Sequence, residues 1–172
     1  VGAGLTLGAF MARAEIMDSL PAPAHIFTLA GNALACAAGN AAFDVYESEA
    51  FQNQLRANSQ KLQELMQWLK EQHPKTVGFY RGIGMSYGIG IVKPDDKGQP
   101  VADPQGAFKV CFRSFELGLV VITLGGHILR IQPPLNISTA HLEKAFEILH
   151  QALAELEEGR LSDDVLSYQF GW

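Results

Sequence analysis

Two pairs of short apolar segments, each pair joined by glycines, limit most strongly what this chain can fold into. The four segments are residues 76–82, 85–92, 119–124 and 127–132. Apolar runs of this length, bounded by glycine and proline, are typical of strands in hairpins. A surface turn over residues 94–99, with proline, aspartate and glycine, follows the first pair. We therefore predict two strand pairs that form one small antiparallel or mixed sheet.

Helical patterns surround these strands. In residues 51–72 the apolar side chains recur every three or four positions, which predicts an amphipathic helix that stops at Pro74. The other predicted helices are residues 14–20, residues 33–49 with Asn32 as N-cap, a helix that Asp103 and Pro104 begin and Gly118 ends, and a C-terminal helix capped by Ser138. Strand pairs alternating with helices predict an α/β chain of the α+β kind, with a small sheet and helices packed on one face.

Residues 1–32 do not share this pattern of strand pairs alternating with helices. Residues 1–13 alternate small and apolar side chains, which predicts a strand or turn emerging from a buried region. The helix over residues 33–49 is rich in alanine and glycine, and small side chains let a helix approach other backbone closely. We therefore predict that this helix sits against a neighbouring domain or subunit. Because the sequence starts inside a glycine-rich apolar segment and without methionine, we expect it to be a piece of a longer protein.

The composition argues against several classes of protein. With 172 residues, 48% of them hydrophobic and 18% charged, the chain is long enough for one domain with a substantial core. The net charge of −5 and the scattered lysines and arginines argue against a nucleic-acid or membrane-surface partner. No apolar run reaches the roughly eighteen residues of a transmembrane helix. Cys36 and Cys111 have no CxxC spacing, which indicates buried free thiols of a cytoplasmic protein.

Single residues, rather than a complete motif, carry the chemistry that can be read from the sequence. The five histidines are scattered, so we predict no metal site, and residues 82–84 are too short for a dinucleotide fingerprint. Arg130 lies in an apolar strand, where a guanidinium must be paired or open to a cleft. It is either an ion-pair partner inside the domain, an edge-strand arginine in water, or a receptor for a carboxylate. Thr28, in a loop before a helix, either satisfies its own turn or binds a phosphate.

Several segments, in the same order along the chain, resemble class III pyridoxal-phosphate-dependent aminotransferases, including the 4-aminobutyrate aminotransferases. The segments are Val1-Gly-Ala-Gly-Leu-Thr-Leu-Gly-Ala9, Thr28-Leu-Ala-Gly-Asn-Ala-Leu-Ala-Cys36, Arg81-Gly82-Ile83-Gly84, Gly118-Leu-Val-Val and Gly126-His-Ile-Leu-Arg130-Ile-Gln-Pro-Pro134. The similarity extends from Val1 to about Leu156. It places the chain in the C-terminal part of such an enzyme.

The resemblance implies a fold, a cofactor and two site residues. In such enzymes the threonine at the position of Thr28 binds the cofactor phosphate of the partner subunit, and the arginine at the position of Arg130 receives the substrate carboxylate. The implied fold is type I, with pyridoxal phosphate as cofactor, in a cytoplasmic homodimer. Residues 1–32 would be the remnant of the large cofactor-binding domain, and residues 33–172 the C-terminal small domain, with residues 33–50 as the linking helix.

The resemblance also implies an activity, which is transfer of an amino group from an amino acid to a 2-oxo acid. We expect an ω-amino acid such as 4-aminobutyrate as the donor. The lysine that holds the cofactor is expected two residues before Val1, so this chain alone is predicted to be inactive. The sequence departs from the family at Thr6, where proline is usual, and at His127, where asparagine is usual.

Two other functions fit the same sequence. The segment around Arg130 and the C-terminal Gly-Trp also resemble class III amino-acid racemases and epimerases such as isoleucine 2-epimerase, which return a proton to the opposite face of the same substrate. A non-catalytic α+β interaction module is the second alternative. It predicts an exposed Arg130 without a convergent pocket, and folding that does not depend on residues 1–32.

Overall fold

The computed structural model describes residues 4–24 and 26–168 and divides into two compact units. The first unit ends at Asn53, and the second begins at Gln54. Helix α3 (Glu49–Gln72) starts in the first unit and continues into the second. No helix within the described ranges is long and apolar enough to cross a membrane.

The first unit contains helices α1 (Ala14–Met17) and α2 (Ala33–Glu47). The predicted N-cap of α2 is confirmed, because the Asn32 side chain accepts a hydrogen bond of 3.1 Å from the Ala35 amide. A Cβ built on Gly39 would lie only 2.7 Å from the Leu7 side chain, which is too close for a larger residue. The absence of a side chain at Gly39 therefore lets the segment before α1 approach α2 closely. At Gly39 a small residue of α2 therefore allows a close approach within this unit, and the predicted contact of α2 with a neighbouring domain or subunit stays a prediction.

The second unit is built on a five-stranded antiparallel sheet. Its strands are β1 (Val77–Ile83), β2 (Ser86–Pro94), β3 (Pro100–Ala102), β4 (Ile122–Leu124) and β5 (Ile128–Ile131). The order across the sheet is β1-β2-β5-β4, and β3 pairs with the far end of β2. The predicted small sheet is confirmed, with β2 as its central strand.

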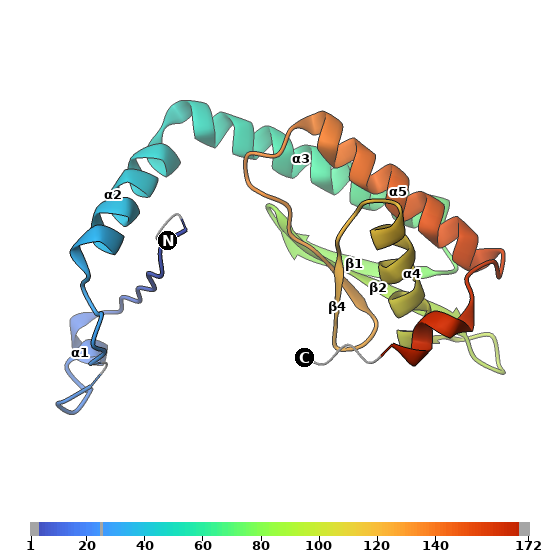
Figure 1. Ribbon diagram of the computed structural model, residues 1–172, viewed down its shortest axis with the longest axis horizontal. Helices are drawn as coiled ribbons and strands as arrows, with labels where there is room; N and C mark the ends of the chain where they lie inside the picture. Colours follow the sequence, from blue (N-terminus) through green and yellow to red (C-terminus); the bar gives the residue numbers. More distant parts are fainter. Residues whose placement is uncertain (1–3, 25, 169–172) are drawn as a thin grey trace. The chain divides into compact units, whose positions relative to one another are not determined.

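One face of the sheet forms the core of this unit. Alternate residues of β2 and β5 point into the core, among them Ile89, Ile91 and Leu129, and each of these three is at most 1% exposed. Three helices cover this face: α3, α4 (Pro104–Glu116) and α5 (Thr139–Glu157) (Figure 1). Their buried apolar residues are Leu62, Met66, Leu69, Ala107, Val110, Leu142, Phe146, Leu149, Ala152 and Leu153. Helices α3 and α5 lie side by side, joined by an ion pair of 2.6 Å between Lys61 and Glu143.

A buried histidine ties the end of α3 to the end of α5. His73, 2% exposed, contacts Glu157 through Nδ1 at 3.0 Å and His150 through Nε2 at 2.8 Å. The Thr76 hydroxyl donates to the same Glu157 carboxylate at 2.6 Å. These bonds satisfy the polar atoms of a residue that would otherwise be costly to bury. This cluster could not be predicted from the sequence, because His73 and Thr76 lie about eighty residues before His150 and Glu157 in the chain.

Several element boundaries differ from the predictions, each for a local reason. Residues 5–13 are neither strand nor helix, and α1 ends at Met17 rather than at residue 20. The strand β3 was not predicted, and it forms because the Asp95 carboxylate accepts from the amides of Lys97 and Gln99 and turns the chain back along β2. A short 3-10 helix at Asp163–Ser167 was also missed.

Two predictions about single side chains need correction. The helix α4 begins after Asp103 as predicted, but this side chain does not cap it and instead pairs with Lys93 at 3.4 Å. Cys36 and Cys111 are free thiols as predicted, yet both are only partly buried. Desolvation nevertheless raises the pKa of the Cys111 thiol to about 12, so this thiol stays protonated at neutral pH.

Candidate functional site

Arg130 lies in a row of residues that crosses the sheet. Backbone pairing places Arg130 of β5 opposite Gly88 of β2 on one side and opposite Ile122 of β4 on the other. Gly88 in turn pairs with Arg81 of β1. Directly paired residues of antiparallel strands point to the same face of a sheet. The row is therefore on the face opposite to the helix-covered core, because the residues on either side of Arg130 in the strand are the buried Leu129 and Ile131.

The Arg130 side chain is exposed, and its guanidinium contacts a neutral group. Arg130 donates through Nη2 to the side-chain oxygen of Gln132, two residues further along the chain. None of the strands β1 to β5 contains an aspartate or a glutamate. In the described part of the chain Arg130 forms no ion pair. Its strand β5 lies between β2 and β4, so Arg130 is not an edge-strand arginine.

Apolar side chains and a glycine surround Arg130 on this face. Ile122 is directly opposite Arg130, and Ile128 is two positions before it on the same strand. On the β2 side, a Cβ built on Gly88 would lie 2.8 Å from the Ile128 side chain, so glycine leaves room there for Ile128. The aliphatic stem of Arg130 therefore stands beside apolar side chains of β4 and β5, while its guanidinium reaches forward to Gln132. Neither Gln132 nor Ile122 was predicted as a site residue, although spacing by two along a strand was a usable signal for Gln132.

A second arginine on this face has a different environment. Arg81 lies two strands away from Arg130, with Gly88 between them. Its guanidinium carbon is 5.8 Å from the centre of the Phe79 ring, a cation–π distance. His127 stands where asparagine is usual in the family that the sequence resembles. Its ring packs edge-on against Phe79, and its Nδ1 bonds to the Gly125 carbonyl at 3.3 Å.

Thr28 is exposed in the turn that leads into α2. The turn closes through the Ala30 amide, which donates to the Phe27 carbonyl at 2.9 Å, and the Asn32 amide, which donates to Leu29 at 3.2 Å. Gly31 adopts a φ of 67°, a backbone conformation that favours glycine, just before the N-cap. Thr28 belongs to the first unit and Arg130 to the second.

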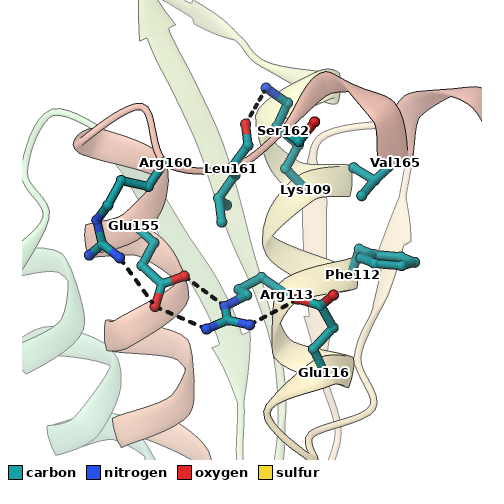
Figure 2. Close-up of a pocket in the computed structure, with 9 residues that line it drawn as sticks. All are labelled: Lys109, Phe112, Arg113, Glu116, Glu155, Arg160, Leu161, Ser162 and Val165. Carbon is teal, nitrogen blue, oxygen red and sulfur yellow. Dashed lines mark hydrogen bonds and ion pairs between the residues drawn. The ribbon is translucent and has the colours of Figure 1, made fainter.

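A pocket of about 520 Å³ in the second unit was not predicted. It lies between α4, the end of α5 and the segment that follows (Figure 2). Its lining residues are Lys109, Phe112, Arg113, Glu116, Glu155, Arg160, Leu161, Ser162 and Val165. Lys109 donates to the Leu161 carbonyl at 3.1 Å and pairs with Asp163 at 2.5 Å, which holds the C-terminal segment against α4.

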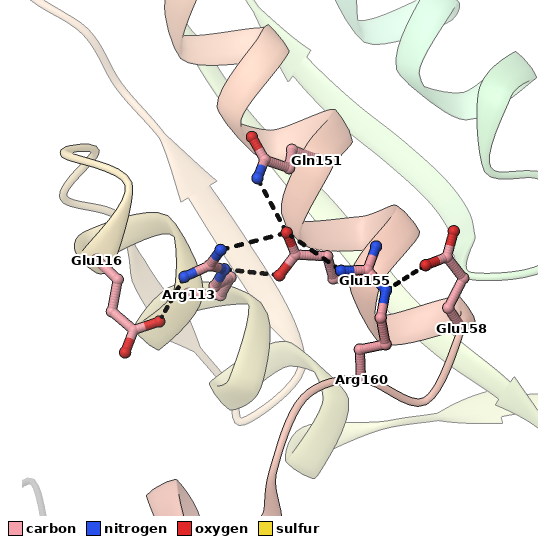
Figure 3. Close-up of polar contacts among 6 residues, drawn as sticks. All are labelled: Arg113, Glu116, Gln151, Glu155, Glu158 and Arg160. Carbon is pink, nitrogen blue, oxygen red and sulfur yellow. Dashed lines mark hydrogen bonds and ion pairs between the residues drawn. The ribbon is translucent and has the colours of Figure 1, made fainter.

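The charges of this pocket are paired with one another (Figure 3). Glu155 accepts from Arg113 Nε at 2.6 Å and from Gln151 at 2.9 Å, and Arg160 Nη1 lies 3.7 Å away. Arg113 also pairs with Glu116 at 2.9 Å. Because each of these cations already has a carboxylate partner, the pocket connects α4 to α5 rather than offering free charge to a ligand.

The Arg113 side chain, and after it Gln151, holds the pKa of Glu155 below the ordinary glutamate value. A carboxylate with a lowered pKa in the folded state contributes stability above its unfolded pKa, about 4.3, and this contribution is lost as the pH falls through the folded value. We therefore expect Glu155→Gln to lower the free energy of unfolding by about 1–3 kcal/mol at neutral pH. The deficit should shrink as the pH falls below about 4. Urea unfolding of parent and variant, at neutral pH and below about pH 4, measures this loss in the free energy of unfolding.

The control for this prediction is Glu147→Gln. The Glu147 side chain is 65% exposed and pairs with Lys144 at 3.0 Å on the surface of α5. An exposed pair of this kind contributes little, so this variant should unfold like the parent chain at both pH values. Equal effects of the two substitutions would show that the Arg113–Glu155 pair has no special role.

No group of three or more histidine, cysteine, aspartate or glutamate side chains is placed to hold a metal ion in residues 4–24 and 26–168. The described chain exposes the guanidinium of Arg130 on its sheet face and Thr28 in its turn. A guanidinium can bind an anionic group by charge-assisted hydrogen bonds, and a threonine hydroxyl can donate one hydrogen bond.

Comparison with known proteins gives the family. The class-III aminotransferase family model matches residues 1–153, and the chain belongs to this family. Membership brings pyridoxal phosphate as the cofactor.

Curated relatives include both reactions of the family. The leucine/methionine racemase of Thermococcus litoralis is 38% identical over 100% of this chain and 38% of its own length. The isoleucine 2-epimerase of Lentilactobacillus buchneri is 35% identical, again over 100% of this chain and 38% of its own length. The 4-aminobutyrate aminotransferase GabT of Escherichia coli is 29% identical over 92% of this chain and 37% of its own length. The chain thus spans somewhat more than a third of these relatives.

Solved structures confirm the type I fold predicted from the sequence. An S-selective transaminase from Bacillus megaterium superimposes with a TM-score of 0.72 and 25% identity, over 87% of this chain and 34% of that protein. An S-selective transaminase from Arthrobacter, with alanine bound, gives the same TM-score of 0.72. The antiparallel sheet with helices on one face is therefore a part of that fold.

Proposed function

We propose that this chain is the C-terminal part of a pyridoxal-phosphate-dependent enzyme that transfers an amino group from an amino acid to a 2-oxo acid. The observation that carries the proposal is Arg130, an exposed guanidinium on a sheet face whose strands hold no acidic residue. Such a group suits a substrate carboxylate, which guanidinium binds through two parallel hydrogen bonds. The expected donor is an ω-amino acid such as 4-aminobutyrate, in line with the relationship to GabT.

The domain assignment and assembly belong to the same proposal. Residues 1–32 are assigned to the large cofactor-binding domain and residues 33–172 to the small domain, with residues 33–50 as the linking helix. The intact enzyme is a cytoplasmic homodimer. The non-catalytic alternative predicts an exposed Arg130 outside a convergent pocket, and Arg130 is exposed and does not line the pocket between α4 and α5. A family match over residues 1–153 nevertheless favours the enzyme.

The residues of this chain fit the cofactor at its phosphate end. Thr28 presents an exposed hydroxyl at a turn that leads into the start of α2, and we assign it to the phosphate. When bound, the cofactor withdraws electrons from the substrate carbon that bears the amino group and so makes the proton on that carbon removable. Arg130 orients the substrate by its carboxylate, which places the amino group and this proton in a fixed direction. The lysine that moves this proton is expected upstream of Val1.

Racemisation or epimerisation of an amino acid is the second candidate. It is favoured by the relatives of 38%, 35% and 33% identity, all of which are racemases or epimerases and match 98–100% of this chain. Transamination and racemisation both start by removing the α-proton, and they differ in where the next proton is delivered. Both need the carboxylate held in place, so Arg130 has the same role in each.

Incubation of the intact enzyme with an L-amino acid in deuterated water, without a 2-oxo acid, separates the two reactions. A transaminase exchanges the α-proton but converts substrate over many turnovers only when a 2-oxo acid is added. Rapid appearance of the α-deuterated D-enantiomer without any 2-oxo acid would overturn the transaminase proposal and establish the second candidate.

Gln132 gives a prediction about the arginine itself. Because the Gln132 side chain already contacts Arg130, Gln132→Glu would place a carboxylate where it pairs with the guanidinium. A tethered carboxylate acts at an effective concentration in the millimolar range, so we expect the KM for a carboxylate substrate to rise about tenfold or more. Steady-state kinetics of the intact enzyme measures this.

The matched control is Gln132→Asn, which keeps the amide and adds no charge. It should leave KM within about threefold of the parent value, because no carboxylate competes with the substrate. If Gln132→Glu leaves KM unchanged as well, Arg130 does not bind the substrate carboxylate.

A further inference from the structure

A histidine cluster, made of His73, His150 and Glu157, joins the end of α3 to α5. His73 is buried, and each of its ring nitrogens faces another titratable group. Its Nδ1 lies 3.0 Å from one oxygen of the Glu157 carboxylate, and its Nε2 lies 2.8 Å from Nδ1 of His150. The Thr76 hydroxyl donates to the other oxygen of Glu157 at 2.6 Å. The ring of His73 is therefore held on both sides by groups whose hydrogen bonding depends on pH.

These distances limit how many hydrogens the cluster can hold. An ionised carboxylate accepts and cannot donate, so Nδ1 of His73 carries a hydrogen and donates it to Glu157. The gap of 2.8 Å between the two rings has room for one hydrogen, which belongs to either His73 or His150. The remaining ring nitrogen of His150 can carry one more. The folded cluster thus accommodates one imidazolium, shared between the two rings, but not two.

A second imidazolium would break the contact between the rings. With both rings fully protonated, two N–H groups would face each other across 2.8 Å, without an acceptor and with like charges in contact. In an unfolded chain nothing opposes the second proton, and histidines there are protonated below about pH 6.5. In acid the unfolded state therefore binds about one proton more than the folded cluster, so stability falls as the pH falls.

The charged groups around the cluster do not remove this conflict. The carboxylate in contact with it, Glu157, has one negative charge and so balances one imidazolium. On α5, Glu147 lies one turn before His150 but is paired at 3.0 Å with a lysine of the same helix. Lys70 lies in the turn before His73 and Lys75 in the loop after it, and both are cations that oppose a further positive charge.

We propose that the histidine cluster is an acid-sensitive latch, which holds the end of α3 on α5 at neutral pH and opens when both rings are protonated. The His73 carbonyl also accepts from the Val77 amide at 2.8 Å, so the latch includes the start of β1. The Trp68 ring of α3 packs 5.2 Å from the His150 ring. Opening would therefore loosen the junction of α3 with β1 and its packing on α5. This inference does not depend on the proposed function.

The test is urea unfolding of the chain between pH 7 and pH 5, in the parent and in His150→Asn. Asparagine places an amide near the position of the imidazole Nδ1, so it can bond to His73 without titrating. The decisive quantity is the unfolding equilibrium constant of the parent divided by that of the variant. If the unfolded parent binds one extra proton, this ratio rises by about ten- to thirtyfold from pH 7 to pH 5. A uniform loss of stability in the variant would not change this dependence on pH.

His141→Asn is the matched control, because His141 is an exposed histidine of the same helix, bonded through Nδ1 to Ser138 at 2.8 Å. The ratio for this control should stay within about twofold over the same range, because an exposed ring can be protonated in the folded state as well. His150→Gln is a second non-titrating amide, for the case in which asparagine prevents folding. A ratio for His150 that stays within twofold, or an equal rise for His141, would show that the cluster is not an acid-sensitive latch.

Discussion

In the intact enzyme, Arg130→Ala is expected to reduce turnover of carboxylate substrates by about thirty- to a thousandfold. The loss of a charge-assisted, two-point contact costs on the order of 2–4 kcal/mol, which converts to this factor. A matching amine that lacks the carboxylate should lose far less, because it never used the guanidinium. The ratio of kcat/KM for the acid and the amine, measured in parent and variant, is the decisive quantity.

Arg81→Ala provides the matched control for this result. Arg81 is also an exposed arginine on the same sheet face, but it lies on β1 beyond Gly88 and stacks on Phe79. Its removal should lower the acid-to-amine ratio by less than about threefold, because the carboxylate does not reach it. An equal loss on acid and amine in Arg130→Ala would mean that Arg130 supports the fold and does not bind the substrate.

The fold could be predicted from the sequence where local patterns and tertiary structure agree. The alternation in residues 127–132 placed Arg130 on the same face as Ile128, and the register confirms it. Asn32 and Ser138 were predicted as N-caps, and both side chains accept the expected backbone amides. These features depend on neighbours within a few residues, which a sequence displays directly.

The parts that were missed depend on tertiary contacts that the local pattern of residues does not display. The strand β3 is three exposed residues that become a strand only because β2 lies beside them. Asn58 is polar on the buried side of α3, and it is accommodated because it donates to the Leu135 and Ile137 carbonyls at 3.1 and 2.9 Å. Neither fact is visible from periodicity, since β3 needs β2 beside it and the partners of Asn58 are 77 and 79 residues away.

The same distinction between local sequence signals and tertiary contacts applies to the site residues. Arg130 could be identified because an arginine in an apolar strand is unusual on physical grounds. Its neighbour Ile122 could not be identified from the sequence, because only the pairing of β4 with β5 brings it next to Arg130. Many other isoleucines of this chain also lie in strands, so residue type alone does not single it out. The role of Thr28 rests on family resemblance, since an exposed threonine in a turn carries no physical signal of its own.

The largest effect on stability is expected from Phe146→Ala. Phe146 is on α5, is 1% exposed, and is the largest of the fully buried side chains. Its truncation removes apolar contact and leaves a cavity between α5, α3 and the sheet, which costs about 3–5 kcal/mol. A domain of this size is typically stable by only about 5–15 kcal/mol, so the variant should unfold at a much lower urea concentration. Far-UV circular dichroism during urea unfolding measures the shift.

Phe115→Ala is the control, because Phe115 is also a helical phenylalanine in the second unit but is 64% exposed. Since little of its surface is removed from water, its loss should lower the free energy of unfolding by less than about 1 kcal/mol. The contrast between the two variants tests whether α5 packs on the sheet as described, because only a buried phenylalanine leaves a cavity behind. If Phe146→Ala unfolds no more easily than Phe115→Ala, the helix-covered face of this sheet is not the core of the unit.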